Sequence, residues 1–232
     1  MMQPPETPQP ERGPPTLDLA EFDRPSWLAD RERFRVLTGA STEVMDDLDA
    51  YFALLSLWSG RMNLVGPSAR QDFWIRHTLD SAQLLRLAPD ANTYADLGAG
   101  AGFPGLVLAI FLKAKGSGQV VLVESMAKRC LFLRTVSTAL NLPTEVHNAR
   151  AESLNLSPVD VVTARACAPL PRLLQYAEPH LRGKTVGLFL KGRDAASEIA
   201  SARNAWRFEA ECLNSLSDPD GRIIKVQRLR RV

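Results

Sequence analysis

One loop of the sequence combines residue types that suit ligand binding. Residues 96–105 read DLGAGAGFPG, with an acid first and a glycine at every second position from Gly98 to Gly102. Glycines allow a sharp turn and let a ligand approach the backbone closely. The loop lies between two apolar runs, 93–97 and 106–112, which we expect to be a strand and a helix. We therefore predict a ligand-binding turn at the carboxyl end of a strand.

Glu124 ends the next expected strand, 22 positions after Gly102. A carboxylate there can accept hydrogen bonds from ribose hydroxyls, so NAD and S-adenosylmethionine both remain possible. Gly100-x-Gly102-x-x-Gly105 also fits the dinucleotide pattern, which is weak alone. Three features favour the methyl donor. They are Asp96 before the turn, where it could face the donor's cationic amino-acid end, the glycine spacing of two, and an expected C-terminal hairpin.

Further elements must position this loop. Expected strands alternate with expected helices, which predicts a parallel sheet, and the DPDG turn at 218–221 predicts a final antiparallel pair. We therefore predict an α/β fold of the class I S-adenosylmethionine-dependent methyltransferases, Rossmann-like, with a mostly parallel seven-stranded sheet, a C-terminal antiparallel hairpin and an N-terminal helical region. The expected strands are 93–97, 119–123, 143–148, 159–164, 185–190, 206–213 and 222–229, and the expected helices lie in 26–59, 72–87, 106–112, 126–140 and 170–181.

The chain divides into three expected parts. Residues 1–15 contain six prolines and few apolar residues, so we expect a disordered tail. Residues 16–90 are expected to form the helical region, packed on the core, and residues 91–232 the methyltransferase domain.

The composition narrows the class of protein. A net charge of +2 on 232 residues neither indicates nor excludes a nucleic-acid partner. The three cysteines are distant from one another and form no CxxC pair, so we expect no metal site and no disulfide framework. The N-terminus lacks the pattern of a secretory signal, and no apolar run is long enough to span a membrane. We expect a monomer in the cytoplasm that does not associate with membranes.

Several short motifs, spread from about Tyr51 to Lys191, resemble those of the ribosomal RNA small subunit methyltransferase G family, also called glucose-inhibited division protein B. Together they are far more specific than the glycine loop alone. Alanine replaces the family's serine at position 164, but the following arginine is retained. The matching motifs are Trp58 with Asn63-Leu64, Arg76-His77-x-Leu79-Asp80-Ser81, the loop 96–105, Lys128-Arg129-x-x-Phe132-Leu133, Ala164-Arg165-Ala166 and Leu190-Lys191-Gly192.

The resemblance implies methyl transfer from S-adenosylmethionine to N7 of a guanine in the decoding-region loop of 16S RNA, in the small ribosomal subunit, with S-adenosylhomocysteine as the other product. Two alternatives stay open: a methyltransferase of small molecules, and a non-catalytic protein that binds RNA or a dinucleotide. The loop and the resemblance together give these donor-binding candidates: Asp96, Gly98, Gly100, Gly102, Phe103, Glu124, Ala151, Glu152 and Arg165. The RNA-binding candidates are Asn63, His77, Asp80, Lys128, Arg129 and Lys191.

The implied reaction needs no general base, because guanine N7 carries a lone pair and no proton. Alignment of the reactants is then the main task, and Arg165 is the candidate for it. His77 suits a buried, hydrogen-bonded role as well as a substrate contact. Cys167 is expected to be a packing residue rather than a nucleophile. Arg222, Arg228 and Arg230 should share one face of the last strand, either as a basic patch or as a charged edge.

Overall fold

The computed structural model describes residues 24–62, 64 and 70–232. The predictions for the tail 1–15 and for Asn63 fall outside the described residues.

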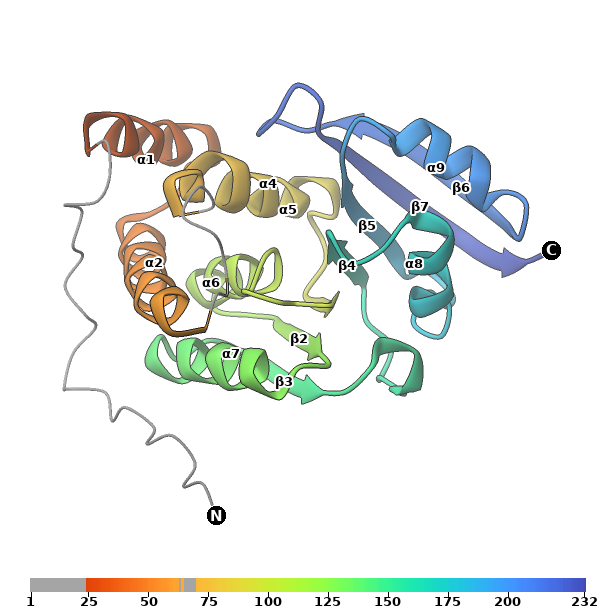
Figure 1. The fold of residues 1–232 in the computed structure, drawn as a ribbon, viewed down its shortest axis with the longest axis horizontal. Helices are drawn as coiled ribbons and strands as arrows, with labels where there is room; N and C mark the ends of the chain where they lie inside the picture. Colours follow the sequence, from red (N-terminus) through yellow and green to blue (C-terminus); the bar gives the residue numbers. More distant parts are fainter. Residues whose placement is uncertain (1–23, 63, 65–69) are drawn as a thin grey trace, which may run out of the picture.

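A seven-stranded sheet forms the centre of the molecule, in the order β3-β2-β1-β4-β5-β7-β6 (Figure 1). The five strands β1 to β5 run parallel, and β7 is antiparallel to both of its neighbours. This arrangement confirms the predicted fold class. The strands are β1 Thr93–Leu97, β2 Gln119–Glu124, β3 Thr144–Asn148, β4 Val161–Arg165, β5 Val186–Lys191, β6 Trp206–Asn214 and β7 Arg222–Arg231.

Helices cover both faces of this sheet, which explains why the central strands are continuously apolar rather than alternating. One face packs with α1 Arg24–Thr38, α2 Thr42–Met62, η1 Phe73–Leu79, α4 Asp80–Ala82, α5 Leu84–Leu87, α6 Gly105–Lys115 and α7 Ala127–Ala139. The other face packs with α8 Leu170–Ala177 and α9 Ala195–Ala202. Two short elements were not expected from the sequence, namely α9 and the 3-10 turn η2 Ala151–Ser153.

The segment η1 is a π-helix, a conformation that occurs mostly in short pieces and frequently at functional sites. It continues into α4, so Arg76, His77 and Asp80 lie on one short stretch of helix. Its residues Phe73 and Trp74 are fully buried against the other helices.

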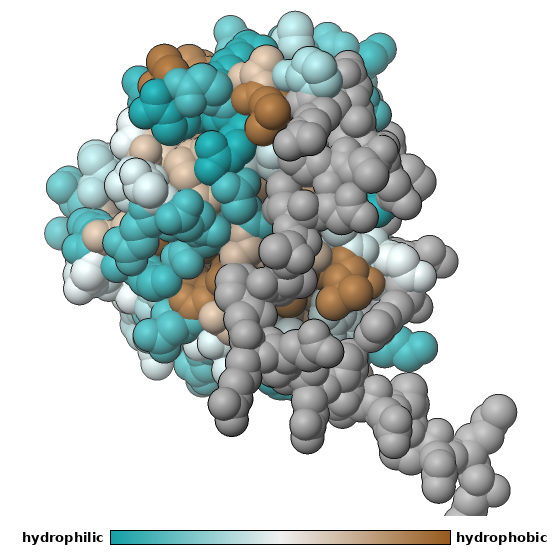
Figure 2. Space-filling view, turned by 90° about the vertical axis from the view of Figure 1, so that its left-hand side faces the viewer, coloured by the Kyte–Doolittle hydropathy of each residue, from teal (hydrophilic) through white to brown (hydrophobic). Residues whose placement is uncertain are grey.

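On the side of the molecule that α1 and α2 form, hydrophobic residues lie in separate patches among hydrophilic ones (Figure 2).

An aromatic cluster joins the N-terminal helices to the glycine loop. The hydroxyl of Tyr51, on α2, donates a hydrogen bond of 2.5 Å to the carbonyl of Ala101. The Phe103 ring lies 5.4 Å from the Tyr51 ring, 5.9 Å from Phe73 and 5.0 Å from His77, between ring centroids. Two helices that precede the loop in the sequence, α2 and η1, therefore hold it in place.

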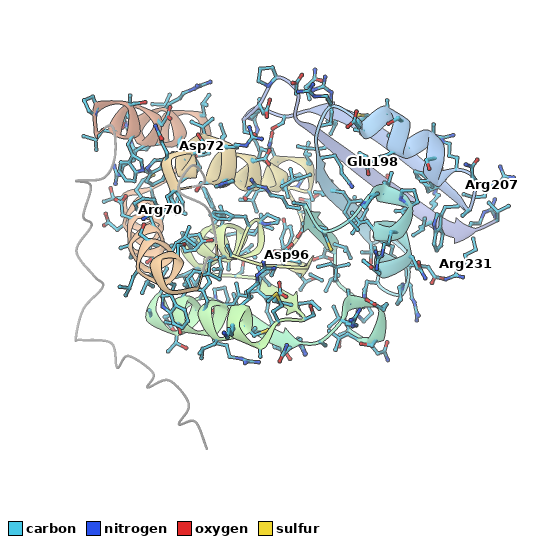
Figure 3. All side chains as sticks on the ribbon, viewed as in Figure 1. Arg70, Asp72, Asp96, Glu198, Arg207 and Arg231 are labelled. Atoms are coloured by element: carbon cyan, nitrogen blue, oxygen red, sulfur yellow. The ribbon has the colours of Figure 1, made fainter. Side chains whose placement is uncertain are left out.

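The prediction that three arginines share one face of the last strand is wrong. Arg207 pairs with Arg230 and Glu209 pairs with Gln227, so two residues of β7 lie opposite one residue of β6. This bulge, where Arg228 has a φ of 54°, reverses the alternation of side chains, so Arg222 and Arg230 lie on opposite faces. Arg231 lies at the end of β7, away from Asp96 and the glycine loop (Figure 3).

Among the residues that the structure describes, no helix is long and apolar enough to cross a membrane.

We predict that Gly102→Ala destabilises the fold more than Gly116→Ala does. Both glycines have a positive φ, of 100° and 73°, so alanine strains the backbone at either position. A Cβ at Gly102 would also lie 2.8 Å from the Tyr51 hydroxyl and closer still to Leu106, whereas a Cβ at Gly116 meets nothing within 4 Å. Urea unfolding should show an extra loss of about 1–3 kcal/mol at Gly102. Equal losses of unfolding free energy in the two variants would show that the contacts of the new Cβ with Leu106 and Tyr51 do not destabilise the protein.

Candidate functional site

The glycine loop turns sharply at the carboxyl end of β1. The amides of Gly98 and Ala99 both donate to the carbonyl of Val123, at 2.8 and 3.0 Å, which anchors the start of the turn to β2. Gly98 and Gly100 have positive φ angles of 74° and 56°. A Cβ at Gly98 would lie 2.9 Å from the Cys167 sulfur, so the loop after β1 and the loop after β4 approach closely at this point.

Two glycines of the motif serve packing inside the protein. A Cβ at Gly105 would lie 2.7 Å from an Asp96 oxygen and closer still to Leu122. At Gly102, as described above, the side chains of Leu106 and Tyr51 leave no room for a Cβ. The side of Gly102 where a Cβ would stand therefore faces the aromatic cluster, which leaves its backbone as the possible contact for a ligand.

Asp96 lies beneath the loop, near the middle of the molecule (Figure 3). Its side chain is fully buried, and its oxygens accept hydrogen bonds of 3.0 Å from the Gly105 amide and the Thr163 hydroxyl. Burial raises the pKa of Asp96 to about 7, although these two hydrogen bonds oppose the shift. Asp96 thus connects β1, β4 and the start of α6.

Beside the loop lies a cavity of about 120 Å³. It brings together four of the predicted donor-binding residues from three separate segments: Gly98, Glu124, and the neighbouring Ala151 and Glu152. Glu124 is almost buried, and its two oxygens accept from the Gly100 amide at 3.0 Å and the Met126 amide at 2.8 Å. The carboxylate is therefore held in one orientation at the end of β2.

Two further residues support this cavity and were not predicted. Tyr176, on α8, lines it. The buried His180 donates a hydrogen bond of 3.0 Å from Nε2 to the carbonyl of Ala151, which positions η2. Neither residue stands out in the sequence, since each belongs to the expected helix 170–181 rather than to a motif.

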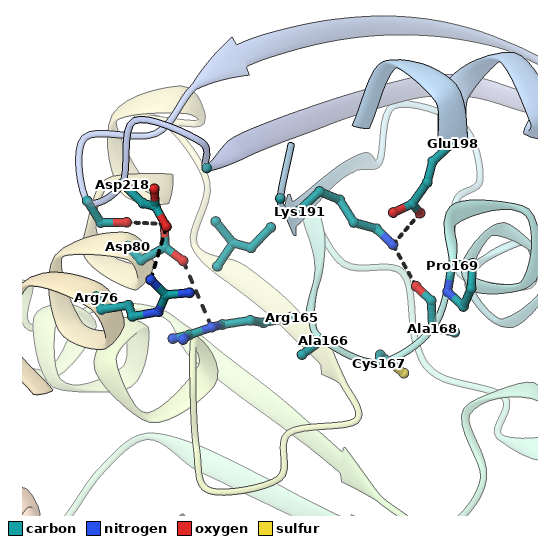
Figure 4. Close-up of a pocket in the computed structure, with 14 residues that line it drawn as sticks. Arg76, Asp80, Arg165, Ala166, Cys167, Ala168, Pro169, Lys191, Glu198 and Asp218 are labelled. Carbon is teal, nitrogen blue, oxygen red and sulfur yellow. Dashed lines mark hydrogen bonds and ion pairs between the residues drawn. The ribbon is translucent and has the colours of Figure 1, made fainter. Parts of the chain in front are cut away.

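A larger cavity, of about 610 Å³, opens at the carboxyl ends of β4 and β5 (Figure 4). Cys167 lines both cavities, so they adjoin at the close approach to Gly98. Burial raises the pKa of the Cys167 thiol, which disfavours the reactive thiolate. The charged side chains along the walls of the larger cavity are Arg76, Asp80, Arg165, Lys191, Glu198 and Asp218.

Arg165 lies between this cavity and the aromatic cluster. Its Nη2 donates a hydrogen bond to Nδ1 of His77, and its guanidinium carbon lies 5.7 Å from the centre of the Phe103 ring. Because arginine can only donate, Nδ1 of His77 must be the acceptor. Burial above all, and then the nearby arginines, lower the pKa of His77 to about 3, so its imidazole is neutral. The structure thus brings together three predicted residues: Phe103, Arg165 and His77.

Asp80 connects the η1–α4 segment to the loop of the C-terminal hairpin. Its Oδ1 accepts from Gln83 at 2.9 Å and from Ser215 and Ser217 at 2.8 Å each. Nearby, Arg76 forms an ion pair of 3.1 Å with Asp218 of the same hairpin loop. Segments more than 130 positions apart in the sequence therefore form one wall of the larger cavity.

The predicted basic residues occupy different environments. Lys191 is almost buried, and its Nζ donates to the carbonyl of Ala168 at 2.6 Å and to Glu198 at 2.7 Å, which holds the loop after β4. Lys128 is exposed at the start of α7. Arg129 lies 3.7 Å from Glu124. Glu198 was not predicted, because α9 itself was missed.

Comparisons with known proteins identify the family. A family model described as rRNA small subunit methyltransferase G matches residues 44–222. The ribosomal RNA small subunit methyltransferase G of Caulobacter vibrioides is 54% identical over 94% of this chain and 99% of its own length. The protein of that name from Methylorubrum populi is 46% identical, over 86% of this chain and 97% of its own length.

Solved structures with low sequence identity share the fold. An O-methyltransferase from Bacillus cereus in complex with SAH has a TM-score of 0.57 and 17% identity, over 88% of this chain and 99% of its own. A fibrillarin/Nop5p complex includes a chain with a TM-score of 0.51 and 15% identity, over 67% of this chain and 83% of its own. From the family match and the identity to curated relatives, we conclude that the chain belongs to the rRNA small subunit methyltransferase G family.

Proposed function

We propose that this protein methylates N7 of a guanine in the decoding-region loop of 16S rRNA, with S-adenosylmethionine as the donor. The observation that carries the proposal is the pair of adjoining cavities. One is lined by Gly98 of the glycine loop and by Glu124, and the other opens at the ends of β4 and β5, with Cys167 common to both. Such a pair suits a donor and an acceptor that meet at one point. Membership of the family supports the choice of substrate.

The residues of the smaller cavity fit the donor. Glu124 is oriented by two backbone amides and offers acceptors for ribose hydroxyls. Ala151 and Glu152 also line the cavity, where they can border the adenosine portion. In this proposal Gly98 and Gly100 lie against the donor, and Gly102 contributes backbone. Asp96 and Phe103 were expected to contact the donor, but we assign them to holding the loop, because Asp96 is fully buried and Phe103 packs in the aromatic cluster. When bound, S-adenosylmethionine supplies an electrophilic methyl group.

Arg165 is proposed to position the reactants. Its side chain is mostly buried and rests against Phe103 and His77, so its guanidinium is held in place beside the larger cavity. Guanine N7 loses no proton, and neutral His77 acts as a hydrogen-bond acceptor rather than as a base. The protein thus contributes alignment and exclusion of water.

RNA binding is assigned by position. Lys128 is exposed, and Arg129 lies 3.7 Å from Glu124 of the smaller cavity, so both can contact phosphates of an RNA bound there. Lys191 reaches the larger cavity but serves first to hold the loop after β4. Asn63 keeps its place among the candidates through its motif alone. The division at residue 90, the monomeric state and the cytoplasmic location stay predictions.

The function is tested by mapping 7-methylguanosine in 16S rRNA from cells with and without this protein, and by methyl transfer to purified small subunits. We expect one modified guanine that disappears with the protein. Transfer to small nucleophiles without any to ribosomal RNA would favour the small-molecule alternative. Donor binding without transfer to either would favour a non-catalytic protein.

We predict that Glu124→Ala lowers the affinity for S-adenosylmethionine by about tenfold or more, because a charged acceptor for the ribose is lost. Isothermal calorimetry measures the affinity, and thermal unfolding shows whether the variant is folded. Glu145→Ala is the matched control, since this exposed carboxylate on β3 pairs with His147 and lines a different cavity. Equal affinities for the wild type and a folded Glu124→Ala variant would remove Glu124 from the donor site.

We predict that Arg165→Lys lowers kcat by about 10–100-fold, because lysine keeps the charge but loses the planar group that aligns the reactants. His77→Asn should have a smaller effect. Because the pKa of His77 is about 3, the imidazole stays neutral from about pH 5.5 to 8, and the pH profile of kcat should show no step due to this residue.

Steady-state kinetics on small subunits at saturating donor measure these effects. A folded His77→Asn variant without turnover, beside a near-normal Arg165→Lys variant, would replace the positioning mechanism with proton transfer.

A further inference from the structure

Reactivity at N7 does not by itself select guanine, because adenine offers the same acceptor on its major-groove edge. The two purines differ at neighbouring positions. Guanine has the acceptor O6 beside the donor N1–H, whereas adenine has an amine beside a bare N1. A guanine-selective site therefore needs a hydrogen-bond donor next to an acceptor in the cavity that receives the base.

Arg165 and Asp80 provide such a pair on the wall of the larger cavity. The Arg165 Nε atom lies 3.9 Å from Oδ2 of Asp80, and the side chains are 18% and 14% exposed. Of the two Arg165 amino groups, Nη2 donates to His77, while Nη1 is buried and has no hydrogen-bond partner among the described residues. A buried donor without a partner is costly, so the guanidinium of Arg165 retains unused donor capacity at the wall of the cavity, which an oxygen on the substrate can satisfy.

Asp80 is held so that one oxygen stays available. Its Oδ1 accepts all three side-chain hydrogen bonds, from Gln83, Ser215 and Ser217. These bonds prevent rotation of the carboxylate and leave Oδ2 facing Arg165 (Figure 4). Within the described part of the chain, Oδ2 has no closer partner than Arg165.

The other two carboxylates of this cavity are placed less well for the same task. Asp218 accepts from Arg76 on one oxygen and from the Asp220 amide on the other. Glu198 accepts from Lys191 and lies across the cavity from Arg165 (Figure 4). Neither therefore stands beside the Arg165 donor.

We propose that Asp80 determines specificity for guanine, with Oδ2 accepting a hydrogen bond from N1–H while Arg165 donates to O6. The inference rests on the proposed function and assigns the choice of base to one pair in that site. Adenine would place its amine against the guanidinium and its bare N1 against the carboxylate, so both contacts become repulsive. A cavity of about 610 Å³ has room for one base.

The experiment compares Asp80→Asn with the wild type on small subunits reconstituted with 16S rRNA that carries guanosine or adenosine at the target position. The measured quantity is the ratio of kcat/KM for guanosine to that for adenosine. The amide that this substitution introduces would turn an N–H toward N1, which suits adenine, so the ratio should fall by about tenfold or more. Asp218→Asn is the matched control, because it removes the same charge from the same cavity and should keep the wild-type ratio.

An unchanged ratio in Asp80→Asn, or the same fall in Asp218→Asn, would overturn the proposal. Thermal unfolding and calorimetry with S-adenosylmethionine show whether each variant keeps its fold and donor site.

If Asp80→Asn does not fold, the wild type is assayed on inosine, which keeps O6 and N1–H but lacks the 2-amino group. Inosine should be methylated about as fast as guanosine. Adenosine should be methylated at about a tenth of that rate or below. Equal rates on adenosine and guanosine would refute the inference. A wild type that does not methylate guanosine at all would instead refute the proposed function.

Discussion

The buried carboxylate of Asp96 joins three elements beneath the glycine loop. It binds the first amide of α6 and the hydroxyl of Thr163 on β4, and it does so with no exposure to solvent. Burying a carboxylate is costly unless it is hydrogen-bonded, and the rise of its pKa to about 7 reflects that cost. Since the glycine loop spans the gap between β1 and α6, the position of this carboxylate decides where the loop lies.

The loop is also held from the outside, by the N-terminal helices. Tyr51 binds the carbonyl of Ala101, and the Phe103 ring packs among Tyr51, Phe73 and His77. The η1–α4 segment, which carries Phe73, also contacts Arg165 through His77 and the hairpin loop through Asp80. The N-terminal helices therefore help to position both regions, because they connect the glycine loop to the wall of the larger cavity.

Charge is arranged locally rather than over the whole surface. The net charge of the chain is only +2, yet the larger cavity is lined by arginine, lysine and carboxylate side chains that are already paired. Paired charges orient one another and present fixed donors and acceptors, which suits selection of a base more than general attraction to RNA. The arginines at the far end of the hairpin lie away from this site.

Local patterns in the sequence were sufficient to predict the fold class and most of its strands and helices. The patterns that predicted the fold are local: the glycine spacing, the apolar pattern of each strand and helix, and the DPDG turn. Each depends on a few neighbouring residues, so it can be recognised without knowing what those residues contact. The carboxylate expected at the end of the second strand does stand there, and it lines the smaller cavity. The π-helix, the bulge in β7 and the short α9 were not predicted, because they depend on packing.

Tertiary structure alone decided what several residues of the motifs do. Asp96 lies beneath the loop, Gly102 and Gly105 are needed for close packing, and Lys191 holds the loop after β4. The contact of Arg165 with His77 spans 88 positions, and that of Ser215 with Asp80 spans 135. Sequence alone determined which residue types stand at the ends of the strands. Which of them meet was decided by folding, because contacts between segments so far apart depend on how the helices pack on the sheet.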